Sequence, residues 1–343
     1  MIIAWNVPRR SEAVRILGEF VFALKKSFLM LFALTSMASS TFAQVYPDHP
    51  VRLIVPFPPA GATDIAARLV GEWLSSVWGQ PVIVDNRTGA SGIIGTEVVA
   101  RAKPDGYTVL MGTLATNVMA HLLQSDVPYA RDAFEPVTLL TSTPNILMAN
   151  GNISAKTLPE LIAYAKANPG KVRYASSGIG LSGHLGVELF AESAGIKLVH
   201  VPYRGSAPSG QAFAGGEVEL TLALVTQALT AMTMAPNIRP LAIASAHRSP
   251  QFPDTPTFAE LGFPNVQVYA INGLMVPKGT PAAIIDKIYR DSRDALTIAA
   301  VKSNLDQLGL DIVASSPAEF GQLLRDEYAR WEPLIRANKS NFQ

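Results

Sequence analysis

The chain has 343 residues, of which 48% are hydrophobic and 16% are charged, and its formal net charge is +1. This composition predicts a globular protein that is large enough for two lobes. The balanced charge offers no basic surface, so nucleic-acid binding is not expected. The sequence has no cysteine, which excludes disulfide bonds, thiol chemistry and lipid attachment at a cysteine.

The first 43 residues have the layout of a secretory signal sequence. Lys25 and Lys26 precede the apolar run 27–37, and the small residues at Thr41–Ala43 suit a cleavage site, although the region before Lys25 is overlong. The apolar run is short for a bilayer span. We therefore expect cleavage near Ala43 and export to the periplasm; an uncleaved membrane anchor is the alternative. Cleavage would remove five basic and two acidic residues and change the formal charge from +1 to −2.

A strand, a loop of small residues and a helix start follow one another at 51–68. The apolar run Leu53–Val55 predicts the strand, and prolines at 56, 58 and 59 end it. Apolar residues then recur at helical spacing from Ile65 to Val77, and Gly79 ends the helix. Free N–H groups at a helix start point outwards, so this loop can hold an anion. An ordinary strand-to-helix turn is the alternative.

We call residues 57–64 the first cradle. Asp64 is its only acidic member, and two roles are open for it: a cap of its own helix, or an acceptor for a ligand ammonium or hydroxyl group. The candidate ligand contacts here are Phe57, Ala60, Gly61, Ala62, Thr63 and Asp64.

The same unit recurs in the second half of the chain. Residues 172–175 predict a strand, 176–183 are a second loop of small residues, and a helix is expected from His184 to Ala194. We call residues 177–182 the second cradle. The candidate contacts are Ser177, Gly178, Ile179, Gly180, Leu181, Ser182 and His184. Two cradles, one in each lobe, indicate a clamp around a ligand that lies between them.

Strands alternate with helices along most of the chain, which predicts an α/β fold with mainly parallel sheets. Ligands bind beyond the carboxyl ends of strands in such sheets. Thr113 and Asn117 follow the expected strand 107–111, so they are candidates for the same crevice, and simple capping of the next helix is the alternative. The extended stretches 137–148 and 266–275 predict two crossings between lobes.

The sequence offers no convincing catalytic or metal-binding arrangement. None of its five histidines forms an H-x₃-H or H-E-x-x-H pair. His184 is read as a hydrogen-bonding partner within the fold rather than a catalytic base. Gly178 and Gly180 lack the third glycine of a dinucleotide fingerprint. We therefore expect no enzymatic activity, no cofactor and no metal; the two cradles need only backbone N–H groups to bind an anion.

Segments spread over the whole chain after residue 43 resemble one family, the Bug-type extracytoplasmic solute receptors of tripartite tricarboxylate transporters. The segments that carry the resemblance are Val55–Phe57 with Gly61–Asp64, Asp85–Arg87 with Gly89–Gly92, Pro104–Tyr107, Tyr174–Gly178, His184–Leu185, His200–Gly205 and Pro277–Pro281. The resemblance implies a two-lobed periplasmic binding protein of type II, the Venus flytrap, with each lobe a sheet flanked by helices. Lobe 1 is expected at 47–143 plus 271–343, and lobe 2 at 144–270.

The resemblance also implies a function. Such receptors bind a small organic carboxylate and deliver it to membrane transporter subunits; we expect a monomer, and the same resemblance adds Tyr203 and Leu224 to the candidate contacts. The alternative is a ligand-loaded co-receptor for a sensor kinase, which would act in signalling rather than uptake.

The chain departs from the family pattern mainly towards apolar or smaller side chains. Ala60 replaces a usual glycine, Ile179 and Leu181 occupy places that are often polar, Leu224 replaces an acidic or amide residue, and residues 271–272 replace an aromatic pair. These departures predict a ligand with one carboxylate and an apolar or aromatic body, rather than an acidic amino acid.

Overall fold

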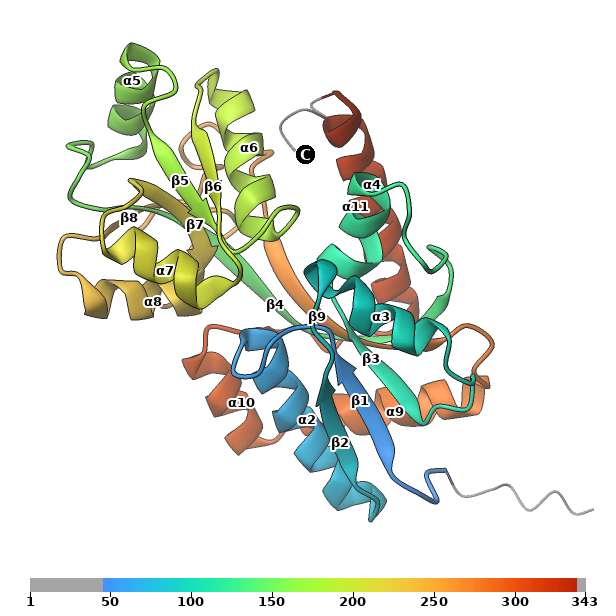
Figure 1. Ribbon diagram of the computed structural model, residues 1–343. Helices are drawn as coiled ribbons and strands as arrows, with labels where there is room; N and C mark the ends of the chain where they lie inside the picture. The colour runs from blue at the N-terminus through green and yellow to red at the C-terminus, as the bar shows by residue number, and fades with distance from the viewer. Residues whose placement is uncertain (1–45, 338–343) are drawn as a thin grey trace, which may run out of the picture. The chain divides into compact units, whose positions relative to one another are not determined.

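The computed structural model describes residues 46–337, and Figure 1 shows the order of its elements. The chain divides after Asp48 into two units, and all the elements below belong to the second unit. The predicted signal sequence, residues 1–43, lies outside the described residues. Every helix within 46–337 is too short or too polar to cross a membrane.

The first lobe is a sheet in the order β2-β1-β3-β9-β4, with β10 added to β4. β1, β2 and β3 are parallel, whereas β9 pairs antiparallel with both β3 and β4. The strands are β1 (Val51–Val55), β2 (Val82–Asn86), β3 (Thr108–Gly112), β4 (Phe134–Ala149), β9 (Tyr269–Pro277) and β10 (Asp311–Ile312), and the helices are α2 (Ala62–Trp78), α3 (Ile93–Ala100), α4 (Ala120–Leu123), α9 (Ala282–Ala295), α10 (Ala299–Gln307) and α11 (Pro317–Ala337).

The two faces of this sheet are covered by different helices. Ile54 and Leu110 share one face, where they join a core with Phe320 of α11. The opposite face carries Leu53 and is covered by α2, because Gly71 of α2 lies against the side chains of β2 that share that face. The first cradle begins α2, so it lies on this second face at the carboxyl end of β1.

The second lobe repeats this plan. β5, β6 and β7 are parallel, and β7 and β8 pair antiparallel with the last residues of β4. Helices α7 and α8 lie side by side over this sheet (Figure 1). The elements are α5 (Leu158–Ala167), β5 (Arg173–Ser176), α6 (Ser182–Ala194), β6 (Val199–Pro202), α7 (Ser206–Ala214), β7 (Leu220–Leu224), α8 (Val225–Met234) and β8 (Arg239–Ile243).

β4 passes from one sheet to the other. It pairs with β9 as far as Pro144 and with β7 from Asn145 onwards. β9 returns beside it, and the N–H of Asn145 donates to the carbonyl oxygen of Val268 just before β9 begins. The prediction of mainly parallel sheets is wrong in part, because these crossing strands pair antiparallel and make each sheet mixed. The predicted residue limits of the lobes stay a prediction.

The C-terminal helix α11 contributes to two hydrophobic clusters, one in each lobe. Phe320, near its start, belongs to the first-lobe core, whereas Trp331 and Ile335 belong to the cluster that also holds residues of α5 and α6. The helix continues through Pro333, and Ile335 is buried as the helical spacing of its apolar residues predicts. A single helix therefore ties the packing of one lobe to that of the other.

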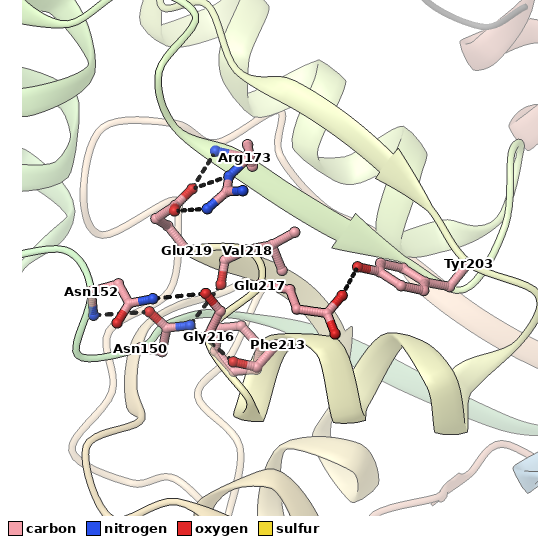
Figure 2. A network of polar contacts seen from close by, with 9 residues as sticks. All are labelled: Asn150, Asn152, Arg173, Tyr203, Phe213, Gly216, Glu217, Val218 and Glu219. Carbon is pink, nitrogen blue, oxygen red and sulfur yellow. Dashed lines mark hydrogen bonds and ion pairs between the residues drawn. The ribbon is translucent and has the colours of Figure 1, made fainter.

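A polar network fixes the turn between α7 and β7 (Figure 2). The buried Asn150, at the end of β4, donates from Nδ2 to the carbonyl oxygens of Phe213 at 2.9 Å and Val218 at 2.6 Å. Arg173 of β5 donates to both carboxylate oxygens of Glu219. The two bonds from Asn150 help to satisfy the carbonyls of Phe213 and Val218, and the ion pair links β5 to the residue before β7.

Candidate ligand-binding site

The first cradle ends at a helix start that has no side-chain cap. Gly61 is the N-cap of α2, with φ −79° and ψ 164°, and no side chain accepts from the first turn. Of the two roles left open for Asp64, that of the N-cap residue is therefore excluded. The first N–H groups of a helix have no intrahelical partner, so those that follow Gly61 remain for a ligand.

Asp64 instead holds the loop in shape. Its Oδ2 accepts from the N–H of Ala60 at 2.9 Å and from Nε of Arg68 at 2.9 Å, and its Oδ1 accepts from Nδ2 of Asn86 at 2.9 Å. The same amide of Asn86 donates to the carbonyl oxygen of Phe57 at 3.0 Å. Asp64 is 2% exposed, so its buried carboxylate fixes the shape of the cradle through these hydrogen bonds.

The pKa of Asp64 is lowered by this setting. Burial alone would raise it, but the hydrogen bonds from Arg68, the Ala60 N–H and Asn86, together with the charge of Arg68, outweigh burial. A lowered carboxyl pKa means that its stabilising contribution is complete above the ordinary value of about 4 and is lost as the pH falls through the lowered pKa.

Ala60 adopts a backbone conformation that favours glycine, with φ +63°. A left-handed conformation costs a non-glycine residue about 1–2 kcal/mol. We expect Ala60→Gly to raise the free energy of unfolding by about 1 kcal/mol in chemical denaturation. The matched control is Ala163→Gly, in the exposed middle of α5, which should lower it by about 1 kcal/mol. A loss of stability in both variants would contradict the strain at Ala60.

Two further loops lie against the first cradle. A Cβ atom at Gly92 would come within 2.7 Å of Cγ2 of Thr116 and 3.3 Å of the ring of Phe57. A π-helical turn, η2 (Ala115–Met119), follows β3. Its buried Thr116 hydroxyl donates to Oδ1 of Asn117 at 2.8 Å and lies 3.3 Å from the Thr113 hydroxyl. The structure thus gathers Phe57, Thr113 and Asn117, and their contact with a ligand stays a prediction.

The second cradle is built like the first. Leu181 is the N-cap of α6, with φ −81° and ψ 162°, and no side-chain cap is present. The N–H of Gly180 donates to Nδ1 of His184 at 3.0 Å, and the N–H of Gly178 donates to Oγ of Ser176 at 3.3 Å. Gly180 has φ +76°, and a Cβ there would collide with Leu123 of α4. The second cradle therefore contacts a helix of the first lobe.

Three aromatic rings, those of His184, His200 and Tyr174, form a stack beside the second cradle. His184 stacks on His200 at 4.1 Å between centroids, and His200 stacks on Tyr174 at 4.8 Å. His200 Nε2 lies 2.6 Å from Oγ of Ser176. His184 is 0% exposed, and its Nδ1 accepts from the loop, so it holds the cradle as the prediction of a hydrogen bond within the fold implies. Burial, and then the neighbouring His184, lower the pKa of His200 to about 3.

This lowered pKa gives a pH prediction. The unfolded chain binds a proton at His200 below about pH 6.5, whereas the folded chain does so only near pH 3, so folding loses stability as the pH falls between these values. We expect His200→Gln to flatten the fall of unfolding free energy between pH 6.5 and 4.5. The exposed His247→Gln is the control and should keep the wild-type slope. Equal slopes in wild type and His200→Gln would contradict the neutral state of His200 in the folded chain.

The other predicted contacts are placed as follows. The Tyr203 hydroxyl donates to Oε2 of Glu217 at 3.1 Å (Figure 2), while its backbone N–H donates to Ser176 beside the second cradle. Ile179 is 42% exposed at the tip of that cradle. Leu224 is the last residue of β7 and faces Asn145 across the strand pair. The hydroxyl and the N–H of Tyr203 thus both have partners within the second lobe, and the contact of Tyr203 with a ligand stays a prediction.

The prediction missed the residues that shape the cradles from behind. Arg68 and Asn86 support the first cradle, and Ser176 and His200 support the second. Asn86, Ser176 and His200 stand inside the segments that carry the family resemblance, which was an available signal. Within residues 46–337, no group of three or more acidic or histidine side chains could hold a metal ion.

Comparison with known proteins agrees with this geometry. Residues 66–339 match the model of the tripartite tricarboxylate transporter family receptor. The chain belongs to this family. BugT of Bordetella pertussis is 36% identical over 306 residues, which cover 89% of this chain and 94% of BugT. The predicted resemblance is therefore confirmed.

Solved structures of similar chains share the fold. The periplasmic binding protein BugD has 32% identity and a TM-score of 0.75, covering 85% of this chain and 98% of BugD. A Rhodopseudomonas palustris protein with adipate has 33% identity and a TM-score of 0.78, covering 85% and 97% of the two chains. MatC of the same organism, with bound malate, has 32% identity and a TM-score of 0.76, covering 84% and 100%. The predicted two-lobed binding-protein fold is confirmed.

Proposed function

We propose that this receptor captures a small organic carboxylate in the periplasm and delivers it to a tripartite tricarboxylate-type membrane transporter, without making or breaking bonds in its ligand. The observation that carries the proposal is the pair of helix starts, at Gly61 and Leu181, that no side chain caps. Each follows the carboxyl end of a parallel strand, in a chain whose relatives bind adipate and malate.

The uncapped helix starts explain how an anion is held without a cation. Backbone N–H groups at a helix start donate to the carboxylate, and the helix dipole favours its negative charge. Neither cradle contains lysine or arginine. Asp64 and His184 shape the two loops from inside, so the N–H groups are oriented before the ligand arrives. One cradle from each lobe lets closure enclose the ligand, and because a single chain supplies both, we propose a monomer.

The side chains of the cradles favour an apolar ligand body. Ile179 and Leu181 flank Gly180 in the second cradle, and Leu224 ends the neighbouring strand β7. We therefore propose a monocarboxylate with an apolar or aromatic body, which differs from the dicarboxylates seen in the two R. palustris proteins.

Isothermal titration calorimetry with a panel of acids tests this proposal. Benzoate, phenylpropanoate and hexanoate should bind at least tenfold more tightly than glutamate, aspartate or citrate. Tight binding of the last three with no response to monocarboxylates would refute the ligand class. No binding of any carboxylate would refute the receptor function.

A further inference from the structure

Three buried side-chain oxygens within residues 46–337 have no hydrogen-bond partner: Thr143 Oγ1, Asn145 Oδ1 and Ser292 Oγ. Thr143 and Asn145 are 0% and 1% exposed and lie two residues apart on β4, where this strand passes between the lobes. A buried polar atom without a partner is costly. Two of them at a crossing between lobes therefore call for a binding role.

Asn145 lies under the start of α6. It is in register with Leu224, the last residue of β7, and Leu147 is in register with Leu222. The Leu147 and Leu222 side chains share a core with α6, and Gly183 at the start of α6 lies against the Leu222 carbonyl. Asn145 shares the face of Leu147 and is one step further towards the carboxyl ends of the strands. Its amide is therefore placed on the α6 face beside the second cradle.

Thr143 has the corresponding place in the first lobe. It is in register with Ala270, and Thr141 is in register with Asn272. Following the register across β9 and β3 shows that Thr141 and Thr143 lie on the same face of the sheet as Met111 and Leu53. This is the face that α2 covers. Both threonines lie at the carboxyl edge of this sheet, the edge where the first cradle begins α2. Nearby, Asn272 donates to the Thr141 hydroxyl at 3.0 Å, so the Thr143 hydroxyl is left over from this pair.

The chemistry of the two oxygens selects a hydroxyl group. Asn145 Oδ1 only accepts, so it rejects a carboxylate, whereas the Thr143 hydroxyl can donate. The Cα atoms of residues two apart on one strand face are about 6.5 Å apart, and a hydroxyl with two hydrogen bonds of about 2.8 Å joins oxygens up to about 5.6 Å apart. The two side chains therefore need to converge by only about 1 Å for one ligand hydroxyl to donate to Asn145 and accept from Thr143. An ammonium group lacks a counter-ion here, because Asp64 is paired with Arg68. We propose that the ligand is a hydroxylated carboxylic acid whose hydroxyl group is bound by Thr143 and Asn145 between the two cradles. This proposal rests on the proposed function.

Calorimetry with matched acid pairs tests it: benzoate against its 2-, 3- and 4-hydroxy derivatives, phenylpropanoate against 3-(4-hydroxyphenyl)propanoate, and hexanoate against 6-hydroxyhexanoate. In at least one pair the hydroxylated acid should bind the wild-type protein at least tenfold more tightly. The ratio to compare is the Kd of the parent acid divided by the Kd of its hydroxylated partner. Asn145→Leu and Thr143→Val should each reduce this ratio below threefold and leave the Kd of the parent acid within threefold of the wild-type value. The melting temperature of ligand-free Asn145→Leu should be no lower than that of the wild type, because the change removes an unpaired oxygen.

Ser292→Ala is the matched control, since it removes the third unpaired oxygen, which lies on α9. It should leave the ratio unchanged. Two outcomes would overturn this inference and leave the proposed function intact. In the first, the parent acids bind but no hydroxylated acid binds more than threefold more tightly. In the second, a tenfold ratio survives both β4 substitutions. If no acid binds at all, both proposals fail.

Discussion

Replacement of Asp64 by alanine is expected to lower the free energy of unfolding by about 2–3 kcal/mol and to abolish carboxylate binding. The change removes the acceptor for the Ala60 N–H, the Asn86 amide and Arg68 at once. Leaving buried donors unpaired costs about 1–3 kcal/mol, and the exposed guanidinium of Arg68 is rehydrated, which limits the loss. The first cradle then loses the bond that fixes Ala60. Urea denaturation and calorimetry measure the two effects.

Asp85→Ala is the matched control for this prediction. Asp85 also pairs with arginines, Arg52 at 2.8 Å and Arg87 at 3.0 Å, but on the surface. Its loss should cost at most about 1 kcal/mol and leave the Kd within threefold. If Asp64→Ala behaves like Asp85→Ala, Asp64 does not hold the first cradle.

Gly183→Ala is expected to weaken carboxylate binding at least tenfold and to lower the free energy of unfolding by about 1–3 kcal/mol. A Cβ atom at Gly183 would collide with the carbonyl oxygen of Leu222, which is part of β7 and cannot rotate away. The start of α6 must move, and the N–H groups of the second cradle move with it. Hydrogen bonds weaken steeply with poor geometry, so affinity falls even if the protein folds.

Gly210→Ala is the control for the second prediction. Gly210 lies within α7, and a Cβ atom there would meet nothing within 4 Å. This variant should be as stable as the wild type or more stable by up to about 1 kcal/mol, with unchanged affinity. Wild-type affinity in Gly183→Ala would show that the start of α6 does not contact the ligand.

The two cradles were predictable because short, local signals specify them. Gly79 adopts the left-handed conformation that ends α2, as its place after the apolar helical pattern predicts. The crossing strands were also predictable, as long apolar stretches. Helix α8 was not predicted: its start directly follows Leu224 without a side-chain cap, so no residue marks the boundary.

The errors share one cause, which is contact between residues far apart in the sequence. Antiparallel pairing of β9 with β4 joins residues more than 120 positions apart, and the sequence pattern does not show strand direction. The role of Asp64 stayed open between a helix cap and a ligand acceptor, because one of its partners, Asn86, lies beyond the end of α2. The unpartnered Thr143 and Asn145 likewise become visible only when the neighbours of β4 are known.

A crystal structure of the protein with a bound monocarboxylate tests the central claim most directly. The account predicts that the carboxylate oxygens accept hydrogen bonds, directly or through one water molecule, from backbone N–H groups of both 57–64 and 177–182. A carboxylate held by only one of these loops, or bound away from both, would contradict it.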